Sequence, residues 1–409
     1  MIDLVFTKMD RVFLYMDRRR CTFLHKLDKL GIRQTVKFEF PFDSLPIVVK
    51  SEVVKMMNIP DRIKLAITSQ RMENLVKRAS IKQPLFYAIR VDKHYPIITM
   101  DVRGDENAAI ADSSRQFDRS NMIGTLELVP WLNRKYSDMQ NMTHIFKKLR
   151  RILPIKRLAL ILIADQLTEK SVKELLSIPE LTTIEFVWIE GDEIESNILK
   201  LIMDWLDTKK DISIIDCHIP EDFHHAKAFK FSSVHYEDAD WVEIEDLLTL
   251  EDCDAVVLGR NYLSSEDVNR FLKFWIESDL DMFEWFSMSA ETLEMTEVLE
   301  DLILVKTSRD GQDYSIVKAS RKRKIMSITL EEEDEDCLRL CVYSPEESFT
   351  KEHKVLELME QKKKLETELQ AMVKNGVEAR RLTMEIRKLS KELDSVCTFY
   401  NEKTAIIAH

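Results

Sequence analysis

Glycine is scarce in this sequence, since only 7 of the 409 residues are glycine although average usage is about 7%. The two nearest glycines, Gly104 and Gly124, stand 20 positions apart. Loops that cradle phosphate, such as the dinucleotide-binding fingerprint and the P-loop, need several glycines at one turn. The sequence therefore excludes both motifs, and we expect no nucleotide cofactor.

Paired cysteines and long apolar runs are also missing. The 6 cysteines include no Cys-x-x-Cys pair, which is typical of a reducing compartment rather than of a disulfide framework or a zinc module. The longest uncharged apolar run covers only residues 158–164, whereas a membrane-spanning helix needs about 20 residues. Lys8, Asp10 and Arg11 interrupt the apolar residues near the amino end, so we expect no signal peptide. These absences predict an intracellular protein, cytoplasmic or nuclear, without a membrane partner.

Residues that could catalyse a reaction or bind a metal do not stand at a diagnostic spacing. His224 and His225 lie near Cys217, Glu221 and Asp222, but none of these pairs has the fixed spacing that zinc ligands use. The sequence contains neither G-x-S-x-G nor H-E-x-x-H, the signatures of two common hydrolase classes. We therefore predict no catalytic site, no metal and no cofactor.

Negative charge is concentrated in one part of the chain. Residues 236–301 hold 20 acidic and 3 basic side chains, a local net charge of −17 (3 − 20), whereas the whole chain carries −12. Such a segment repels phosphate backbones, so nucleic acid is not an expected partner. The basic run 321–324 allows two interpretations, a nuclear-localisation cluster or a charged hairpin turn, and the turn is favoured.

Residue patterns divide the chain into four regions, with boundaries at 1–36, 38–80, 84–345 and 350–403. The first is basic and stays unassigned. The second predicts a compact helical unit, with one helix that has Pro46 in its first turn and a second helix from residue 62 to about residue 80.

The last region predicts a coiled helical hairpin. It is rich in Lys, Glu and Leu, and apolar residues recur at heptad spacing on both sides of Asn375-Gly376, a pair that suits a tight turn between helices. Lys362 occupies a position in the apolar seam and weakens it. The sequence leaves open whether the hairpin packs on itself, self-associates or binds a partner.

Region 84–345 alternates short strands with amphipathic helices, a pattern that favours parallel strands joined by crossover helices. The predicted strands cover residues 86–91, 97–102, 125–129, 157–164, 183–189, 212–216, 234–236, 255–258 and 282–288. Three further strands, at 314–318, 325–330 and 338–343, are expected to close the array in antiparallel order.

A repeat runs through this region. Residues 253–263 fit the leucine-rich-repeat pattern L-x-x-L-x-L-x-x-N-x-L with Cys253 for the first leucine, and residues 160–167 and 212–219 fit its core. The first apolar core positions, 160, 184, 212, 234, 256 and 283, are separated by steps of 24, 28, 22, 22 and 27, within the roughly 20–29 residues of such repeats. A degenerate leucine-rich-repeat-like parallel β/α array is therefore favoured over a doubly wound sheet. Such arrays present long binding surfaces rather than one deep pocket.

The helical region resembles an F-box. The resemblance rests on a Leu-Pro opening, an apolar helix, a break, and a second helix with a serine and a trailing apolar pair. These features are carried by Leu45, Pro46, Val49, Val53, Asn58, Asp61, Ile63, Leu65, Ala66, Ser69, Met72, Leu75 and Val76.

Residues further along resemble the F-box-associated domain of the large nematode F-box families. The similar stretches are 238–248, 256–258 and 269–275, and the strand at 314–318 is similar to the tail of that domain. The two resemblances together cover about residues 38–345. The chain as a whole is thus similar to a nematode-type F-box protein with an F-box-associated domain.

This resemblance implies a substrate-recognition subunit of an SCF-type (Skp–cullin–F-box) ubiquitin ligase, with ubiquitin chemistry supplied by partner subunits. The expected partners are a Skp-type adaptor, a cullin scaffold and a protein target. The adaptor-contact residues it implies are Leu45, Pro46, Val49, Val53, Ile59, Ile63 and Leu65. The acidic stretch favours a basic target surface, and Asp238, Asp240, Glu243 and Glu245 are candidate target-binding residues. The alternative is a leucine-rich-repeat-like interaction scaffold without a ligase role.

Overall fold

A computed structural model describes residues 42–57, 59–79, 85–91, 96–101, 131, 133, 135–136, 138–153, 155–291, 293–309, 311–331, 336–371 and 376–407. The chain divides into two compact units, Met1–Met56 and Met57–His409. Predicted region 1–36 and the predicted strand at 125–129 lie outside the described residues.

The described part of the first unit is one turn and one helix. The short 3-10 helix η1 (Phe42–Ser44) precedes α2 (Ile47–Met56), and the Leu45 amide donates to the Phe42 carbonyl at 3.2 Å. Pro46 directly precedes α2, and its carbonyl accepts the Lys50 amide at 3.0 Å. Proline suits this place because the amide group that it lacks would have no partner within the helix.

Two helices begin the second unit, where the sequence predicted one. The helix expected from residue 62 to about 80 is instead α3 (Ile59–Thr68) and α4 (Gln70–Arg78). Ser69 separates them, because it adopts an extended backbone and its side chain accepts a hydrogen bond from the Met72 amide at the start of α4. Ser is a preferred N-cap residue for this reason.

One sheet of 14 strands runs through the described part of the second unit. Its central strands, β3 to β8, are all parallel and pair in the order of the sequence. Their bounds are β3 (Ile155–Ile163), β4 (Phe186–Glu190), β5 (Asp211–Ile215), β6 (Ser233–Asp238), β7 (Cys253–Arg260) and β8 (Phe283–Ser289). Next to β3 lie β1 (Leu85–Val91), parallel to it, and β2 (Pro96–Asp101), antiparallel to β1.

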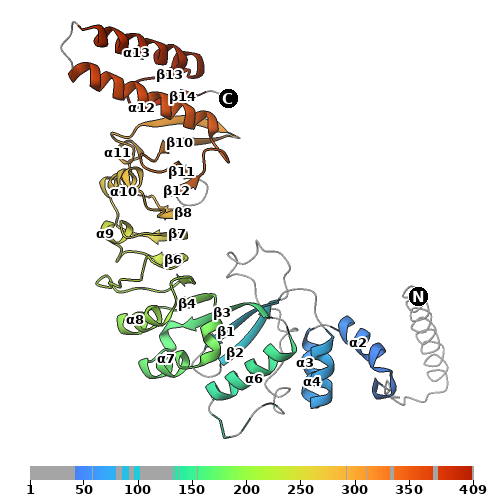
Figure 1. Cartoon of the computed structure of the whole chain (residues 1–409). Coiled ribbons are helices and arrows are strands. Elements are labelled where there is room, and N and C mark those ends of the chain that lie inside the picture. Colours follow the sequence, from blue (N-terminus) through green and yellow to red (C-terminus); the bar gives the residue numbers. More distant parts are fainter. Residues whose placement is uncertain are drawn as a thin grey trace, which may run out of the picture. The chain divides into compact units, whose positions relative to one another are not determined.

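Helices lie along one side of strands β4 to β8 (Figure 1). They are α7 (Glu169–Leu176), α8 (Ser196–Trp205), α9 (Ile244–Leu247), α10 (Ser265–Glu277) and α11 (Met295–Val298). Helix α6 (Asp138–Ile152) precedes β3, and the 3-10 helices η4 (Ala164–Gln166) and η5 (Pro179–Thr183) flank α7. Alternate strand residues such as Ile214, Tyr236 and Val256 are fully buried. The predicted strand at 183–189 starts later than expected, because η5 occupies residue 183.

The sheet continues past β8 in antiparallel order and includes three strands that were not predicted, β9, β13 and β14. Strands β12 (Cys337–Tyr343), β11 (Ile325–Glu331) and β10 (Gln312–Lys318) follow β8, and β9 (Leu304–Arg309) follows β10. The C-terminal strand β14 (Thr404–Ile407) pairs parallel with β9, and β13 (Phe399–Tyr400) pairs with β14. The missed strands β9 and β14 therefore lie side by side although nearly 100 positions separate them.

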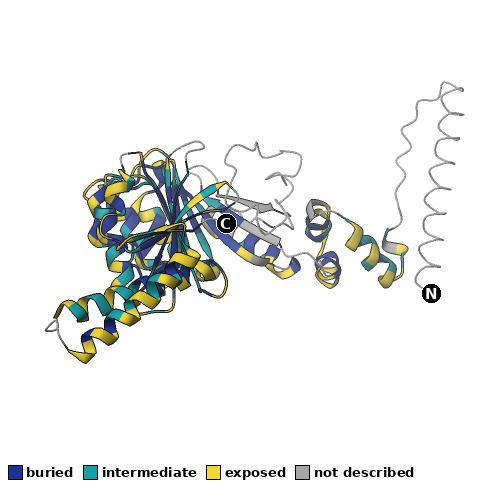
Figure 2. Ribbon diagram, turned by 90° about the horizontal axis from the view of Figure 1, so that it is seen from above, coloured by how far each residue is buried: buried dark blue, intermediate teal, exposed yellow. Residues whose placement is uncertain are grey.

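Helices α12 (Thr350–Ala371) and α13 (Val377–Val396) contact each other and join this end of the sheet. Residues of β9, β10, β11, β14 and both helices form one apolar core, which includes Val305, Ile316, Leu356, Leu393 and Ala405. Near the loop between the helices the side chains are mostly exposed (Figure 2). The start of α12 is therefore part of the sheet's core, whereas the far half of the helix pair projects from it.

The predicted mixed α/β class is confirmed, with a small helical region before a large sheet.

Candidate protein-interaction surfaces

Helix α2 exposes apolar side chains to solvent. Ile47 is 55% exposed, Val48 69% and Met56 69%, whereas Val54 is fully buried. The one buried polar residue of this helix, Lys50, lies with its ammonium group 5.8 Å from the centre of the Phe42 ring. An apolar helix surface in contact with water is a candidate docking surface for another protein.

The predicted adaptor-contact residues differ in their accessibility. Pro46 is exposed, and Leu45, Val49, Val53 and Leu65 are half-buried. Ile63 is fully buried, and the side chain of Ile59 is outside what the structure describes. Ile47 and Val48 were not among the predicted contacts, although they follow Pro46 directly and continue the same apolar stretch.

Two buried charged residues hold α3 and α4 in place. Arg62 of α3 donates to the Met57 carbonyl at 2.9 Å and to the Ala79 carbonyl at 3.4 Å, and burial lowers the pKa of its guanidinium. Glu73 of α4, only 4% exposed, accepts a hydrogen bond from Lys148 of α6 at 2.8 Å. Helix α4 is thereby tied to α6, the described helix that precedes β3.

Much of the predicted acidic target surface is neutralised within the chain. The Arg260 side chain lies 3.3 Å from an Asp238 oxygen and 2.8 Å from an Asp240 oxygen, and Asp238 also pairs with His218 at 2.6 Å. The exposed Glu245 is paired with Arg270 at 2.9 Å, and this hydrogen bond lowers the pKa of Glu245.

Glu243 is the fourth predicted residue. It is exposed and its amide donates to Asp246 at the start of α9. Of the four candidates, only Glu243 makes no ion pair with another described residue. The negative charge that is free to attract a partner must therefore be sought among other acidic side chains.

Unneutralised acidic side chains lie at the amino ends of the parallel strands. Asp211 begins β5, and its pKa is raised to about 6, chiefly by burial and then by the charge of Asp254. Asp254 is exposed and accepts a hydrogen bond from the Ser232 hydroxyl at 2.6 Å. Neither carboxylate forms an ion pair with another described residue, although the charges of Arg157 and Lys210 also act on Asp211.

Asp211→Asn should stabilise the protein near neutral pH and not in acid. The folded-state pKa of Asp211 lies above its unfolded value of about 3.9, so the native state loses stability as the pH rises from about 4 to about 6. After discounting for partial access to water, the gain in unfolding free energy should be about 1 kcal/mol at pH 7.

Urea unfolding of the two proteins at about pH 4 and pH 7 measures this difference, since the linkage predicts a gain that grows with pH. The exposed Asp279 provides the matched control, because Asp279→Asn should change stability little at either pH. An equal gain at both pH values for Asp211→Asn would contradict the assignment.

The basic run 321–324 is a turn between β10 and β11. Lys322 donates to the Leu280 carbonyl and lies 4.8 Å from the centre of the Trp275 ring, and Arg323 pairs with Glu346. The preferred interpretation as a charged turn agrees with this placement, because two of its four cations are bound to other parts of the domain.

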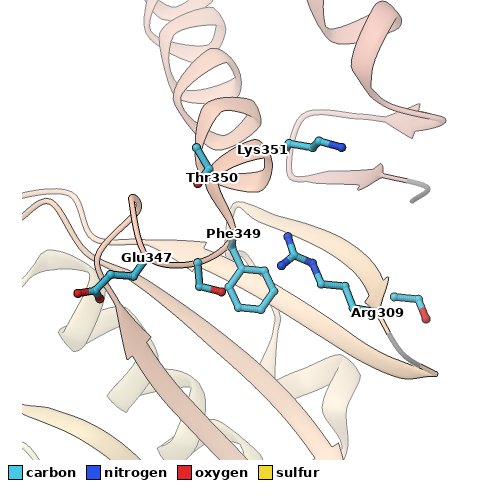
Figure 3. A pocket seen from close by; sticks show the side chains of 7 residues that line it. Arg309, Glu347, Phe349, Thr350 and Lys351 are labelled. Atoms are coloured by element: carbon cyan, nitrogen blue, oxygen red, sulfur yellow. The ribbon is translucent and has the colours of Figure 1, made fainter.

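A surface hollow of about 730 Å³ lies where β9 meets the start of α12. Arg309, Glu347, Phe349, Thr350 and Lys351 line it (Figure 3). The Arg309 guanidinium donates to both oxygens of the fully buried Glu352, at 2.7 and 2.8 Å, and packs 4.2 Å from the centre of the Phe349 ring. The arginine of this hollow is thus engaged in holding α12 to β9.

In the ranges that the structure describes, no three His, Cys, Asp or Glu side chains are grouped as a metal site requires. No helix within those ranges is both long and apolar enough to span a membrane.

Two family models match the chain. Residues 42–84, which include α2, α3 and α4, match the F-box domain, and residues 222–288, which include β6, β7 and all but the last residue of β8, match an F-box-associated domain. The resemblance inferred from the sequence is therefore confirmed: the chain combines an F-box with an F-box-associated domain of the nematode type.

Individual relatives resemble only parts of the chain. A stretch of 70 residues is 37% identical to the E3 ubiquitin-protein ligase hecw-1 of Caenorhabditis elegans, and it covers 17% of this chain and 6% of that protein. Among solved structures, M. capricolum TrmK in complex with S-adenosyl-homocysteine is 12% identical, with 58% of this chain and 92% of that chain covered, at a TM-score of 0.14. A TM-score this low carries no information about fold or function.

Proposed function

We propose that this protein is the substrate-recognition subunit of an SCF-type E3 ubiquitin ligase. Its F-box binds a Skp-type adaptor on a cullin scaffold, its α/β domain binds a protein target, and partner subunits carry out ubiquitin transfer. The observation that carries the proposal is the presence of an F-box and an F-box-associated domain in one chain. The short similarity to a protein named as an E3 ubiquitin ligase is consistent with a role in ubiquitination.

The exposed apolar surface of α2 supports the adaptor interface. Leu45 and Pro46 lead into the helix, and Ile47 and Val48 extend the accessible apolar surface beyond the predicted contacts Val49 and Val53. Ile59 and Leu65 remain proposed contacts. Ile63, being fully buried, would contribute by supporting the helices rather than by direct contact.

We further infer that β3 to β8 form a leucine-rich-repeat-like array that presents the target-binding surface. The sequential parallel pairing of these strands supports this inference. So does Asn261, at the asparagine position of the repeat, which donates to the Gly259 and Ser289 carbonyls at 2.8 and 3.2 Å and thus links neighbouring repeats.

A pull-down of the purified chain with a Skp-type adaptor tests the proposed function. The wild type should bind, and the Leu45→Ala/Pro46→Ala double variant should lose at least about tenfold in affinity, because interface energy is concentrated in a few buried apolar contacts. Lys55→Ala is the matched control in α2, since the Lys55 side chain is exposed and its ion pair with Glu52 lies at the surface.

Failure of the wild-type chain to bind the adaptor, with its circular dichroism intact, would contradict the ligase role. A leucine-rich-repeat-like interaction scaffold would then be the better account. Self-association through α12 and α13 is a separate proposal, supported by the exposure of Val377 (88%) and Met384 (71%), and sedimentation of the purified chain tests it.

A further inference from the structure

Strands β4 to β8 have a second face that no described helix covers. Helices α7 to α11 lie along one side of these strands (Figure 1), and the side chains that point toward them, such as Val187, Ile212 and Leu258, are at most 1% exposed. Among the alternate positions, Trp188, His235 and Val257 are only partly buried, whereas Ser213 and Ser287 are buried. These alternate residues form what we call the open face of the sheet.

The strand register arranges the open face in rows that cross the strands. One row is Phe186, Asp211, Ser233, Ala255 and Trp285. The next row is Trp188, Ser213, His235, Val257 and Ser287. Aromatic side chains therefore stand on β4 and β8, at the two ends of the face. The positions between them are mostly polar (Asp211, Ser213, Ser233 and His235, with Ala255 and Val257). The result is a sheet floor with aromatic ends and a mainly polar centre.

Carboxylates border this floor, and most of them have no cation as a partner. Asp211, Asp254 and Glu284 lie at the amino ends of β5, β7 and β8, and Glu237 lies near the carboxyl end of β6; none of them forms an ion pair with a described residue. Two further acids are neutralised, Glu185 by Arg157 at 3.4 Å and Glu190 by Arg90 at 2.6 Å. The open face thus has aromatic side chains at its two ends, a mainly polar centre and carboxylates along its borders.

We propose that the open face of β4 to β8 binds an extended, basic segment of a protein partner, which under the proposed function is the ubiquitination target. Lysine and arginine side chains of that segment pair with Asp211, Asp254, Glu284 and Glu237, and its apolar side chains pack on Trp188 and Trp285. Five strands about 4.8 Å apart span about 19 Å, the length of about six residues of extended chain. The negative borders exclude nucleic acids and anionic membranes as occupants, because both would be repelled.

Selection from a random 12-residue peptide library, displayed on phage and applied to the full-length chain, tests this proposal. Peptides rich in Lys and Arg with interspersed apolar residues should be enriched. The strongest binder, made synthetically, should lose at least about tenfold in affinity in the Asp254→Lys/Glu284→Lys variant, measured by fluorescence anisotropy, because two attractive contacts become repulsive. Its affinity should also fall as salt is added.

The control is Glu297→Lys/Glu300→Lys, which makes the same charge change at two exposed residues in and after α11, on the helical side. The peptide affinity of this control variant should stay within about twofold of the wild-type value, because the two substitutions lie away from the open face. Enrichment of neutral or acidic peptides, no enrichment, or equal losses in both variants would overturn the proposal.

Adaptor binding measured on the same variants separates this proposal from the proposed function. Loss of peptide binding in Asp254→Lys/Glu284→Lys with adaptor binding intact supports both. If the chain binds the peptide but not the adaptor, the ligase role is contradicted and the proposed site for a basic segment is supported. If the chain binds the adaptor but does not bind basic peptides as described, only the proposed peptide site is contradicted.

Discussion

Replacing Glu352 by alanine should lower the free energy of unfolding by about 3–5 kcal/mol, because it leaves a charge without its partner in a buried place. Glu352 is completely buried in the first turn of α12, and both of its oxygens accept hydrogen bonds from Arg309 of β9. The negative charge also lies at the helix N-terminus, where the helix dipole favours it. Urea unfolding followed by circular dichroism measures the loss, and hydrogen exchange should locate it in α12, α13, β9 and β14.

Two further variants distinguish a buried pair from a general loss of packing. Lys354→Ala, two residues further along α12, should cost less than about 1 kcal/mol, because Lys354 is exposed and pairs with Glu392 only at the surface. The double variant Arg309→Met/Glu352→Leu should recover most of the stability, since removing both charges leaves neither unpaired. A loss for Glu352→Ala as small as that for Lys354→Ala would contradict the prediction.

The second large effect is expected at Trp275, where substitution by alanine should cost about 3–5 kcal/mol by leaving a cavity in the core. Trp275 is fully buried in α10, inside the segment that matches the F-box-associated domain, and Lys322 lies over its ring. Thermal unfolding of the full chain measures this loss.

Trp275→Phe is the informative comparison. The indole N–H of Trp275 has no hydrogen-bond partner among the described residues, so phenylalanine removes an unsatisfied donor and keeps most of the ring. It should cost far less than alanine, about 1 kcal/mol. Phe274→Ala, at the neighbouring and partly exposed position, is the matched control and should have a small effect. Equal losses for the alanine and phenylalanine variants of Trp275 would indicate that the N–H, not the ring volume, stabilises this core.

The sequence predicted secondary structure accurately where the pattern depends on residues close together in the chain. The apolar pairs Ile212 and Ile214, Val234 and Tyr236, and Val256 and Leu258 each mark one strand, because alternate residues of a strand share a face. The repeated order of strand and connection then predicts parallel pairing with the next strand. The division of helix 62–80 at Ser69 was missed because a serine within a helical pattern is also compatible with an uninterrupted helix.

The candidate site was harder to predict, because charge counted along the chain does not reveal which charges meet. The stretch 236–301 carries −17, yet the register of β6 and β7 places Asp238 opposite Arg260, and Arg270 reaches Glu245. The acids left without a cation, such as Asp254 and Glu284, are no different in sequence from their paired neighbours. The open face therefore emerges only when the strands are placed side by side.

The sequence by itself determined the F-box with its apolar helix, the alternation of strands and helices, and the mixed α/β class, because each depends on residues close together in the chain. Only the tertiary structure decided that β14 pairs with β9, that α12 is anchored through Glu352, and which acidic side chains stay unpaired. These features join residues that are far apart in sequence, and their energies come from shared burial and from electrostatic contacts that form only when the chain has folded.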